Sequence, residues 1–339
     1  MARPPLRELA ARAGVSEATA SRVLNGRLGV SDELRDRVRR AMVELGFGDV
    51  PEPARARRDV VGIVCGEFLN PVFATLVHHV STELGRRELL AIVAVTDRSQ
   101  MPEERCIAEL VERQVDGVIS IGGRHSEIDG DLSHYAELLT SGMPLVFVNG
   151  AHTGLPVPHI TCDEEAGART AVAHLAQLGH RRIGCVLGST AYIPTQRFVR
   201  GYRRALHDAG LDEPDEAISH AAFTLEGGRA GATRLITQGI TAMIAGNDLM
   251  ALGALAAADA LGTDIAVVGY DGTDMTAFTN PPLTTLRQPF EVMAQHVADA
   301  IVAEIAGVPT FRDSFVFHPQ LVTRSSTPGL SPAVPARMN

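Results

Sequence analysis

From position 60 onward, short runs of valine, isoleucine and leucine alternate with segments that show a helical spacing of apolar residues. Strands are predicted at 60–64, 89–95, 116–122 and 144–149 and, after a restart near 160, at 182–188, 217–222, 242–246 and 265–271. Helices are predicted near 73–87, 103–113, 132–141, 164–178, 198–209, 228–238 and 249–261. Continuous apolar strands with helices between them indicate parallel sheets covered on both faces. Two such cycles predict an α/β body of two doubly wound lobes, with ligands bound at the carboxyl ends of the strands.

Residues 1–47 have a different pattern, that of three short helices. Apolar positions within 6–13 repeat at helical spacing, and Gly14 ends that helix. Ser16 is expected to cap a second helix, and a third is expected to begin at Ser31. Two helices joined by a tight glycine turn and followed by a third predict an all-α helix-turn-helix head.

The second helix of the head has an apolar face and a polar face. In a helix-turn-helix unit the polar face lies in the major groove, so Arg22 is expected to grip guanine, Glu17 to accept from a cytosine amine and Ala18 to touch a thymine methyl. Contacts to phosphate oxygens are expected from Ser16, Thr19, Ser21 and Asn25. The alternative interpretation is a solvated face on a small helical subdomain.

Charge is unevenly divided along the chain. Residues 1–58 contain 12 arginines against 8 acidic residues, whereas the whole chain has a net charge of −9, so the body is strongly acidic. A basic head on an acidic body favours nucleic-acid binding through the head. None of the 31 basic residues is a lysine, which excludes a Walker A phosphate site and a Schiff base.

Several further protein classes are disfavoured by the sequence. No apolar run approaches the roughly 20 residues that a membrane helix needs, and residues 1–30 lack a signal-peptide core, so we expect a cytoplasmic protein with no membrane contact. No P-loop, HExxH or GxSxG motif occurs, and we expect no catalytic site, metal or cofactor. The cysteines lack CxxC spacing and are expected to be buried free thiols: Cys65, Cys106, Cys162 and Cys185.

Two long motifs near the N-terminus resemble a known family. LRELAARAGVSEATASRVLNG at 6–26, followed by VSDELRDRVRRAMVELGF at 30–47, is similar to the N-terminal signature of the LacI-type (lactose/galactose repressor) family of bacterial transcription regulators. The body resembles the periplasmic-binding-protein-like core of the same family over about 60–327. The segments that carry this second resemblance are NPVF at 70–73, DEEAGARTAVAHLAQLGHRRIGCVLG from 163, RGYRRAL at 200–206, AMIAGNDLMALGAL from 242, VVGYDGT from 267, PPLTTLRQPF at 281–290 and LVTRSST at 321–327.

The resemblance implies a division of the chain into domains. These are a DNA-binding head at 1–47, a linker at 48–59, a two-lobed effector-binding and dimerisation domain at 60–327, and a disordered tail at 328–339. Lobe one is expected at about 60–160 with 289–317, and lobe two at about 161–288 with 318–327. The chain is therefore expected to cross back to lobe one after residue 288 and to return to lobe two with its last strand.

The resemblance also implies that a small-molecule effector binds in the cleft between the lobes. By matched position its contacts are Phe73, Asp163, Phe223, Asn247, Asp271, Gln288 and Phe290. The two phenylalanines Phe73 and Phe290 have an alternative as simple core residues. Asp248 is expected to cap the helix that follows, which leaves Asn247 for the ligand. Where the family usually carries a ligand-binding arginine this chain has Phe198, and one of the nearby Arg197 and Arg200 is the expected substitute.

The linker departs from the family pattern. Family repressors usually place a short helix there that inserts a leucine into the minor groove. Pro51 and Pro53 oppose such a helix in this chain. We expect a loose linker in which Arg55, Arg57 and Arg58 contact phosphates or a narrow minor groove, with little bending of the DNA.

Together these patterns predict a transcription regulator, and specifically a repressor, that binds palindromic double-stranded operator DNA as a homodimer. Its DNA affinity is expected to depend on a small-molecule effector in the cleft. The expected effector is a sugar or sugar derivative, with a nucleobase as the alternative. A sugar-binding protein without DNA binding is the competing class, and an enzyme is disfavoured by the missing motifs.

Overall fold

The computed structural model describes residues 5–24, 32–46, 58–66, 68–97, 100–150, 154–308, 310 and 314–329. Residues 1–59 and 60–339 belong to two separate compact units. The predicted linker lies outside the described residues except for its last two positions. The predicted tail is described only to Gly329, and the chain is still bonded to the body there, because the Pro328 carbonyl accepts from His180 Nε2 at 3.0 Å.

The head has the predicted helices, α1 (Leu6–Ala13), α2 (Glu17–Leu24) and α3 (Asp32–Glu44). Gly14 ends α1 with a φ of 64°, a left-handed conformation that glycine adopts without strain. Arg37 of α3 donates to the carbonyls of Ala13 and Gly14 at 3.1 and 2.7 Å, which ties the third helix to the turn between the first two. The head core consists of Leu9, Ala10, Ala13, Ala20, Val23, Val38, Ala41 and Met42.

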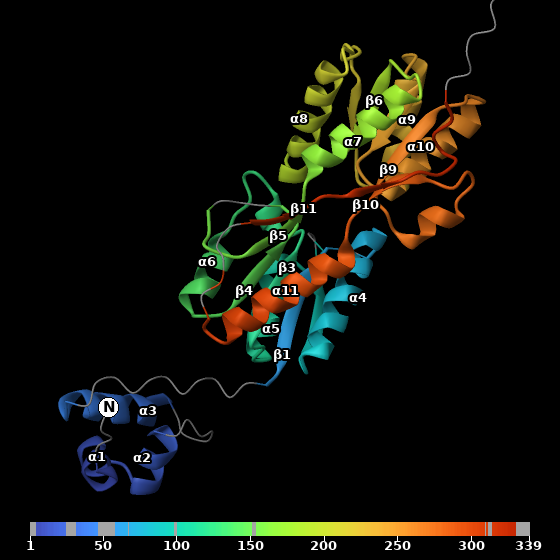
Figure 1. Ribbon diagram of the computed structural model, residues 1–339. Coiled ribbons are helices and arrows are strands. Elements are labelled where there is room, and N and C mark those ends of the chain that lie inside the picture. Colours follow the sequence, from blue (N-terminus) through green and yellow to red (C-terminus); the bar gives the residue numbers. More distant parts are fainter. Residues whose placement is uncertain are drawn as a thin grey trace, which may run out of the picture. The chain divides into compact units, whose positions relative to one another are not determined.

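Lobe one of the body is a six-stranded parallel sheet in the order β11-β5-β4-β3-β1-β2 (Figure 1). Its strands are β1 (Val60–Cys65), β2 (Leu90–Val95), β3 (Gly117–Ile121), β4 (Leu145–Val148), β5 (His159–Cys162) and β11 (Ser314–Phe317). Helices α4 (Pro71–Arg86) and α11 (Phe290–Ile305) pack on one face, and α5 (Glu103–Glu112) and α6 (Ser133–Thr140) on the other. A short 3-10 turn, η1 (Arg124–Ser126), follows β3.

Lobe two repeats this architecture with the sheet order β12-β10-β9-β8-β6-β7. Its strands are β6 (Ile183–Leu187), β7 (Ile218–His220), β8 (Ala242–Ala245), β9 (Ala266–Asp271), β10 (Thr284–Arg287) and β12 (Gln320–Val322), of which β12 alone among the described strands runs antiparallel to its neighbour. Helices α7 (Glu164–Gln177) and α8 (Ile193–Asp208) cover one face, and α9 (Leu225–Thr237) and α10 (Asp248–Leu261) the other. The turn η2 (Asp274–Phe278) follows β9.

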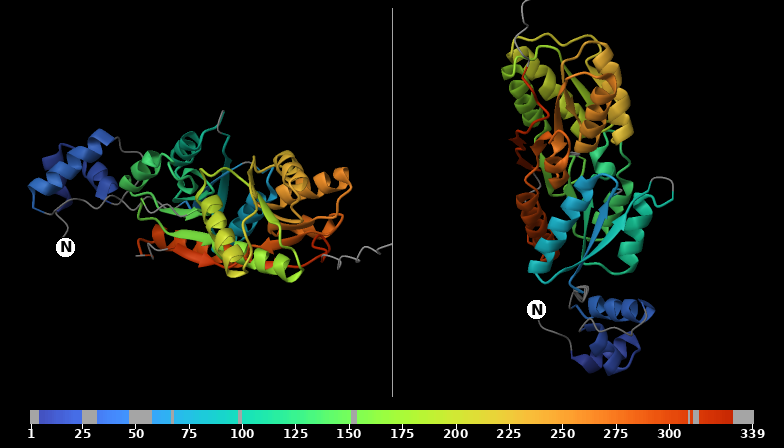
Figure 2. Two further views of the ribbon diagram at one scale, coloured as in Figure 1. Left: turned by 90° about the horizontal axis from the view of Figure 1, so that it is seen from above. Right: turned by 90° about the vertical axis from the view of Figure 1, so that its right-hand side faces the viewer.

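The chain passes between the lobes at three places. It leaves lobe one after β5, returns between β10 and α11, and leaves again between β11 and β12. Figure 2 shows this last part of the chain, coloured orange to red, running along one side of both lobes. The crossovers after β5 and β11 are bonded together, since Asp163 N donates to Phe317 O at 2.8 Å.

The structure differs from the predicted elements at several points, and the strands β10 and β11 were not predicted. α8 begins at Ile193, five residues before the predicted start, because Pro194 occupies the first turn, where proline is tolerated. β5 was not predicted, since it has only four residues, and it carries lobe one to Cys162, beyond the predicted end at 160. α11 was not predicted as a helix, although its buried residues pack in the core of lobe one and its polar residues Glu291, Gln295 and Asp299 form an exposed stripe at helical spacing.

Candidate functional site

The predicted DNA contacts centre on α2. The Ser16 hydroxyl accepts from Thr19 N at 3.1 Å, which is the predicted N-cap bond, and it also shares a hydrogen bond of 2.8 Å with the Thr19 hydroxyl. Ser16 and Glu17 are exposed, while Thr19 and Ser21 are half-buried. Ala20 and Val23 are buried in the head core, so the helix has the predicted division into an inner and an outer face.

Other predicted DNA contacts fall where the structure gives no side-chain position. Ala18 and Arg22 are residues of α2 whose side chains lie outside the described part. Asn25, Arg55 and Arg57 lie outside the described residues altogether. These five remain predictions from the sequence.

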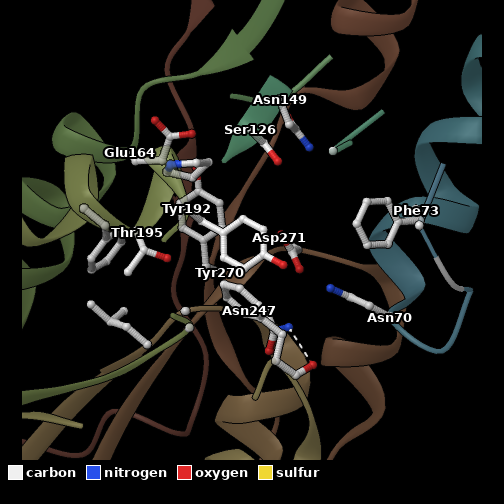
Figure 3. Close-up of a pocket in the computed structure, with 18 of the residues that line it drawn as sticks. Asn70, Phe73, Ser126, Asn149, Glu164, Tyr192, Thr195, Asn247, Tyr270 and Asp271 are labelled. Carbon is white, nitrogen blue, oxygen red and sulfur yellow. Dashed lines mark hydrogen bonds between the residues drawn. The ribbon is translucent and has the colours of Figure 1, made fainter. Parts of the chain in front are cut away.

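A cavity of about 510 Å³ lies in the body and is lined by both lobes (Figure 3). Its volume is in the range that holds small-molecule ligands. Lobe one contributes Gly66, Asn70, Phe73, Thr96, Asp97, Gly122, Ser126 and Asn149. Lobe two contributes Glu164, Leu187, Gly188, Tyr192, Pro194, Thr195, Phe198, Phe223, Gly246, Asn247, Tyr270 and Asp271, and Gln288 lines the cavity from the crossover between β10 and α11.

The lining residues come mainly from the carboxyl ends of parallel strands. Gly66 follows β1, Asn149 follows β4, Gly188 follows β6 and Asn247 comes two residues after β8. Parallel strands end at the same edge of a sheet, so their following residues gather there. The cavity therefore lies where the sequence pattern predicts a ligand site.

Glycines let two aromatic rings reach the pocket wall. A Cβ atom on Gly122, whose φ is 64°, would lie 2.9 Å from the Phe73 ring. A Cβ atom on Gly188 would overlap the Phe223 ring. Phe73 and Phe223 line the pocket as predicted, and Figure 3 shows the Phe73 ring facing the cavity. Both rings offer an apolar surface to a ligand.

Asp271 and Gln288 form the polar centre of the pocket. Gln288 Nε2 donates to Asp271 Oδ1 at 2.9 Å, and Gln288 N donates to the Asp271 carbonyl at 3.0 Å. Asp271 Oδ2 and Gln288 Oε1 are buried and have no hydrogen-bond partner. Burial and the nearby Asp248 carboxylate raise the pKa of Asp271 well above its ordinary value, although the Gln288 bond opposes this. The unpartnered oxygens of both side chains are therefore available for hydrogen bonds with a ligand.

The predicted cap of α10 is wrong: it is Asn247 and not Asp248. Asn247 is the residue that caps α10, because its Oδ1 accepts from Met250 N at 2.8 Å, and its Nδ2 donates to Phe223 O at 3.3 Å. Asp248 is buried behind the wall and accepts from Thr273 N, Thr273 Oγ1 and Thr285 Oγ1 at 2.7 to 2.9 Å. Asn247 still lines the pocket, but its side chain is held by the protein.

Three predicted effector contacts do not line the pocket. Asp163 caps α7, since its Oδ1 accepts from Ala166 N at 2.9 Å. Phe290 is buried in the lobe-one core and stacks on His79, which is the alternative that the sequence left open. Arg197 faces Glu164, with 3.8 Å between Nη1 and Oε2. The helical phase of α8 instead turns Thr195 and Phe198 to the cavity, so Phe198 belongs to the wall and Arg197 does not.

Glu164 is the main pocket residue that the sequence analysis missed. It is 6% exposed, and its Oε2 has no hydrogen-bond partner. Burial raises the pKa of Glu164 to about 7, against the opposing effects of its own backbone N–H and of Arg197. Its position directly after the capping residue of α7 was the available signal. Asn70, Ser126, Asn149, Tyr192 and Tyr270 were also missed.

The chain matches two family descriptions. Residues 5–48 match "Bacterial regulatory proteins, lacI family", and residues 172–327 match "Periplasmic binding protein-like domain". The HTH-type transcriptional regulator MalR of Streptomyces coelicolor is 39% identical over 331 residues, which cover 95% of this chain and 96% of that protein. None of the helices in the described ranges combines the length and apolar character needed to cross a bilayer.

Solved structures show the same relationship. The transcriptional regulator CelR in complex with cellobiose has a TM-score of 0.72 and 32% identity, over 96% of this chain and all of that one. The lac repressor dimer bound to operator and the anti-inducer ONPF has a TM-score of 0.70 and 26% identity, with the same coverage. The chain belongs to the LacI family. It is a DNA-binding transcription regulator and not an enzyme.

Proposed function

We propose that this regulator is a homodimeric repressor that binds a palindromic operator and whose DNA affinity depends on a saccharide in the pocket. The observation that carries the proposal is the joining of a helix-turn-helix head to a body whose cavity contains buried, unpartnered acceptors beside aromatic rings. Hydroxyl groups on a sugar ring supply donors for those acceptors, and the ring's apolar face packs on the aromatic rings. The cellobiose bound to CelR supports this class of effector.

An exposed apolar edge of lobe one supports the homodimer. β2 lies at the end of its sheet and exposes Leu90, Val93 and Val95, of which Leu90 is 63% exposed. Unpaired apolar edge strands are unfavourable in monomers and are normally covered. A second copy of this chain would cover the strand, and the relative solved as a dimer on its operator supports the same arrangement. A protein that acts on chromosomal DNA works in the cytoplasm.

DNA contacts are proposed for the outer face of α2 and for the linker. Arg22 and Glu17 would read base edges, while Arg55 and Arg57 would neutralise phosphates. The linker prolines distinguish this chain from repressors that kink their operators. Permuted-fragment gel shifts should accordingly show little bending.

The test separates the two activities. A thermal-shift screen of saccharides and nucleobases on the full chain identifies the effector class, because a ligand at 100 times its dissociation constant adds about 2.7 kcal/mol to stability. Arg22→Ala should lose about 1–3 kcal/mol of operator discrimination and keep the ligand shift. Deletion of residues 1–58 should abolish DNA binding with the ligand shift retained. A shift with nucleobases alone would overturn the saccharide effector, and equal affinity for symmetric and random DNA would overturn the repressor.

A further inference from the structure

All charged side chains on the described pocket wall have the same sign. Asp97, Glu164 and Asp271 line the cavity, and Asp248 lies behind Asp271 close enough to raise its pKa. No arginine or histidine occurs among the lining residues that the structure describes, and the chain has no lysine. Arg197 contacts Glu164 without lining the cavity. The described wall therefore offers no cationic group to pair with an anionic ligand, and its carboxyl groups add negative charge wherever they are ionised.

The unsatisfied atoms of the wall are also of one kind. Asp271 Oδ2, Glu164 Oε2 and Gln288 Oε1 are buried without a hydrogen-bond partner, and all three are acceptors. A buried acceptor left without a donor is costly, so a ligand that binds well must bring donors to these positions. A carboxylate or phosphate brings further acceptors and a second negative charge.

We propose that the effector is a saccharide that carries no negatively charged group, an inference that rests on the saccharide effector proposed above. Its hydroxyl groups donate to Asp271, Glu164 and Gln288, and its apolar ring faces pack on Phe73 and Phe223. Phosphorylated and acidic saccharides are rejected, because their charge would be desolvated beside Asp271 with no arginine to pair with it. The pocket thus responds to free sugars and ignores their phosphates.

Matched pairs of saccharides test this charge rule on the full chain. Calorimetric titrations compare maltose with maltose 1-phosphate, cellobiose with cellobiose 1-phosphate, and trehalose with trehalose 6-phosphate, pairs in which every sugar ring stays closed. The uncharged member of any pair that binds should do so about 100-fold more tightly, the selectivity that one unpaired buried charge causes. The variant carrying both Asp271→Asn and Glu164→Gln should reduce that ratio. Glu165→Gln is the matched control, because Glu165 pairs with Arg200 at 2.9 Å outside the pocket, and should leave the ratio unchanged.

The outcomes distinguish this inference from the proposed function. An acidic member that binds as tightly as its uncharged partner overturns the charge rule and leaves the saccharide effector standing. A selectivity ratio that is the same in the double variant and in Glu165→Gln also overturns it. Failure of both members of every pair to bind would count against the saccharide effector itself, and the charge rule would fall with it.

A second inference comes from backbone contacts between the lobes. Ile128 N, in the segment after η1 of lobe one, donates to Ala191 O of lobe two at 2.9 Å. Glu127 lies opposite Tyr192 in an isolated antiparallel bridge. We call this pairing of 127–128 with 191–192 the clasp. It joins the lobes at residues remote in sequence from all three chain crossovers.

The lobe-one half of the clasp is held by a buried polar network. Arg124 N donates to Glu103 Oε2 at 2.8 Å, while Ser120 Oγ at 2.9 Å and Tyr135 OH donate to Glu103 Oε1. His125 is fully buried, and its Nε2 donates to Asn149 O at 2.8 Å. This network fixes η1, so the core of lobe one sets the position of residues 127–128.

Both halves of the clasp continue directly into the pocket wall. Ser126 precedes Glu127 and lines the cavity, as Tyr192 does from the other lobe (Figure 3). The Tyr192 ring packs edge-on against Phe223, with 5.9 Å between the ring centroids. Formation of the clasp therefore brings a hydroxyl from lobe one and an aromatic pair from lobe two to the same cavity.

We infer that the clasp is the element that closes the lobes on the effector and opens to release it. A single backbone hydrogen bond contributes only about 0.5–1.5 kcal/mol, so the clasp alone holds the lobes weakly and lets ligand exchange. A ligand that touches Ser126 and Tyr192 together adds to that bond and favours the closed state. Ligand binding in the pocket thereby shifts the two lobes toward the closed arrangement.

A reversible cross-link tests the clasp in the full chain. Glu127→Cys with Tyr192→Cys places two thiols opposite each other, at a separation that a disulfide spans, while the native cysteines are buried. Diamide should form this disulfide without any ligand. The oxidised protein should then exchange maltose or cellobiose at least about 10-fold more slowly than the same protein reduced with dithiothreitol, because the pocket cannot open. The oxidised and reduced proteins both lack the Tyr192 ring, so the comparison between them cancels the effect of losing it.

A backbone variant provides the opposite perturbation. Ile128→Pro removes the donor N–H, and Ile128→Ala is its matched control, since alanine keeps it. The proline variant should release the sugar about fivefold faster than the alanine variant, in proportion to one lost hydrogen bond. Absence of the disulfide, equal exchange in the oxidised and reduced protein, or equal release by the two Ile128 variants would each overturn the clasp. Disulfide formation needs no sugar, so this arm decides the contact even if no saccharide binds.

Discussion

The two lobes have the same strand order but build different halves of the pocket. Lobe two supplies the buried acids Glu164 and Asp271 and two aromatic pairs, Tyr192 with Phe223 and Phe198 with Tyr270. Lobe one supplies Phe73 and a set of neutral polar residues: Asn70, Thr96, Ser126 and Asn149. The lobe-one acid Asp97 is exposed. The two lobes therefore share a fold but present different kinds of side chain to the pocket.

The difference indicates a division of labour. Lobe two binds by charge and by aromatic surface, so its substitutions should change affinity and selectivity strongly. Lobe one positions small neutral groups through its buried network, so its substitutions should act through stability and through modest losses of single hydrogen bonds. Four substitutions test that division.

The largest effect is expected for the pH dependence of Glu164→Gln. Because the pKa of Glu164 is raised to about 7 in the folded protein, above its ordinary value, the folded state holds a proton that the unfolded state has released. Stability from this group is present at about pH 4 and is lost as the pH rises through about 7. The free energy of unfolding of the unmodified protein should fall by about 3 kcal/mol relative to Glu164→Gln over that interval. Urea denaturation at several pH values measures this, with Glu165→Gln as a control, and a pH-independent difference would contradict it.

Next in size is the loss of effector affinity in Asp271→Asn. A buried polar group that loses its hydrogen-bond partner costs about 1–3 kcal/mol, and the asparagine amide cannot replace the carboxyl in both of its hydrogen bonds, so the variant should bind the effector about 10- to 100-fold more weakly. Asparagine also tolerates the positive φ of 109° found at this position. Calorimetry with the identified saccharide provides the measurement. Asp274→Asn, three residues away and exposed, is the control, and equal affinities of the two variants would refute the role of Asp271.

A lobe-one substitution of intermediate size is Glu103→Gln. The amide presents a donor where Ser120, Tyr135 or Arg124 N already donates, so one buried donor loses its acceptor. The free energy of unfolding should fall by about 1–3 kcal/mol. Denaturant unfolding beside Glu104→Gln, a half-buried neighbour outside the network, tests this. Equal stability of the two variants would show that the network does not hold η1.

The smallest effect is expected for Ser126→Ala. Its hydroxyl donates to Gly123 O at 2.6 Å and lines the pocket, and no charge is involved. Effector affinity should fall by no more than about fivefold, the loss that one neutral hydrogen bond causes. The comparison with Asp271→Asn under identical titration conditions is the measurement. A larger effect at Ser126 than at Asp271 would reverse the division between the lobes.

Local signals in the sequence were sufficient for most of the fold. Gly14 and Ser16 mark the ends of α1 and α2 because each satisfies helix-end groups by itself, and the strands of both sheets stand out as continuous apolar runs. Elements that depend on distant partners were harder to predict. β5 mixes polar and apolar residues although all four are buried. α11 was missed although Glu291, Gln295 and Asp299 form an exposed polar stripe at helical spacing.

The pocket shows the same limit. Asn247, Asp271 and Gln288 lie at strand ends or after them, where topology alone predicts a site. Which residue of α8 faces the cavity depends on the helix phase, and the expectation of a ligand-binding arginine favoured Arg197 over Phe198, which occupies the matched position. Ser126 reaches the wall only through the network around Glu103, whose members are far apart in sequence. A local sequence pattern cannot predict a pocket residue that is placed by contacts distant in sequence.

Asp271 is connected to the segment between the lobes as well as to the pocket wall. Its φ of 109° turns its carbonyl to Gln288 N at 3.0 Å, while its side chain is bonded to Gln288 Nε2. Gln288 lies where the chain returns to lobe one, so the residue proposed to contact the saccharide is also hydrogen-bonded to the connecting segment. A change at the pocket therefore reaches the segment that connects the lobes directly, without other side chains between them. A single substitution at Asp271 or Gln288 can therefore abolish the response of DNA binding to the effector while the protein stays folded.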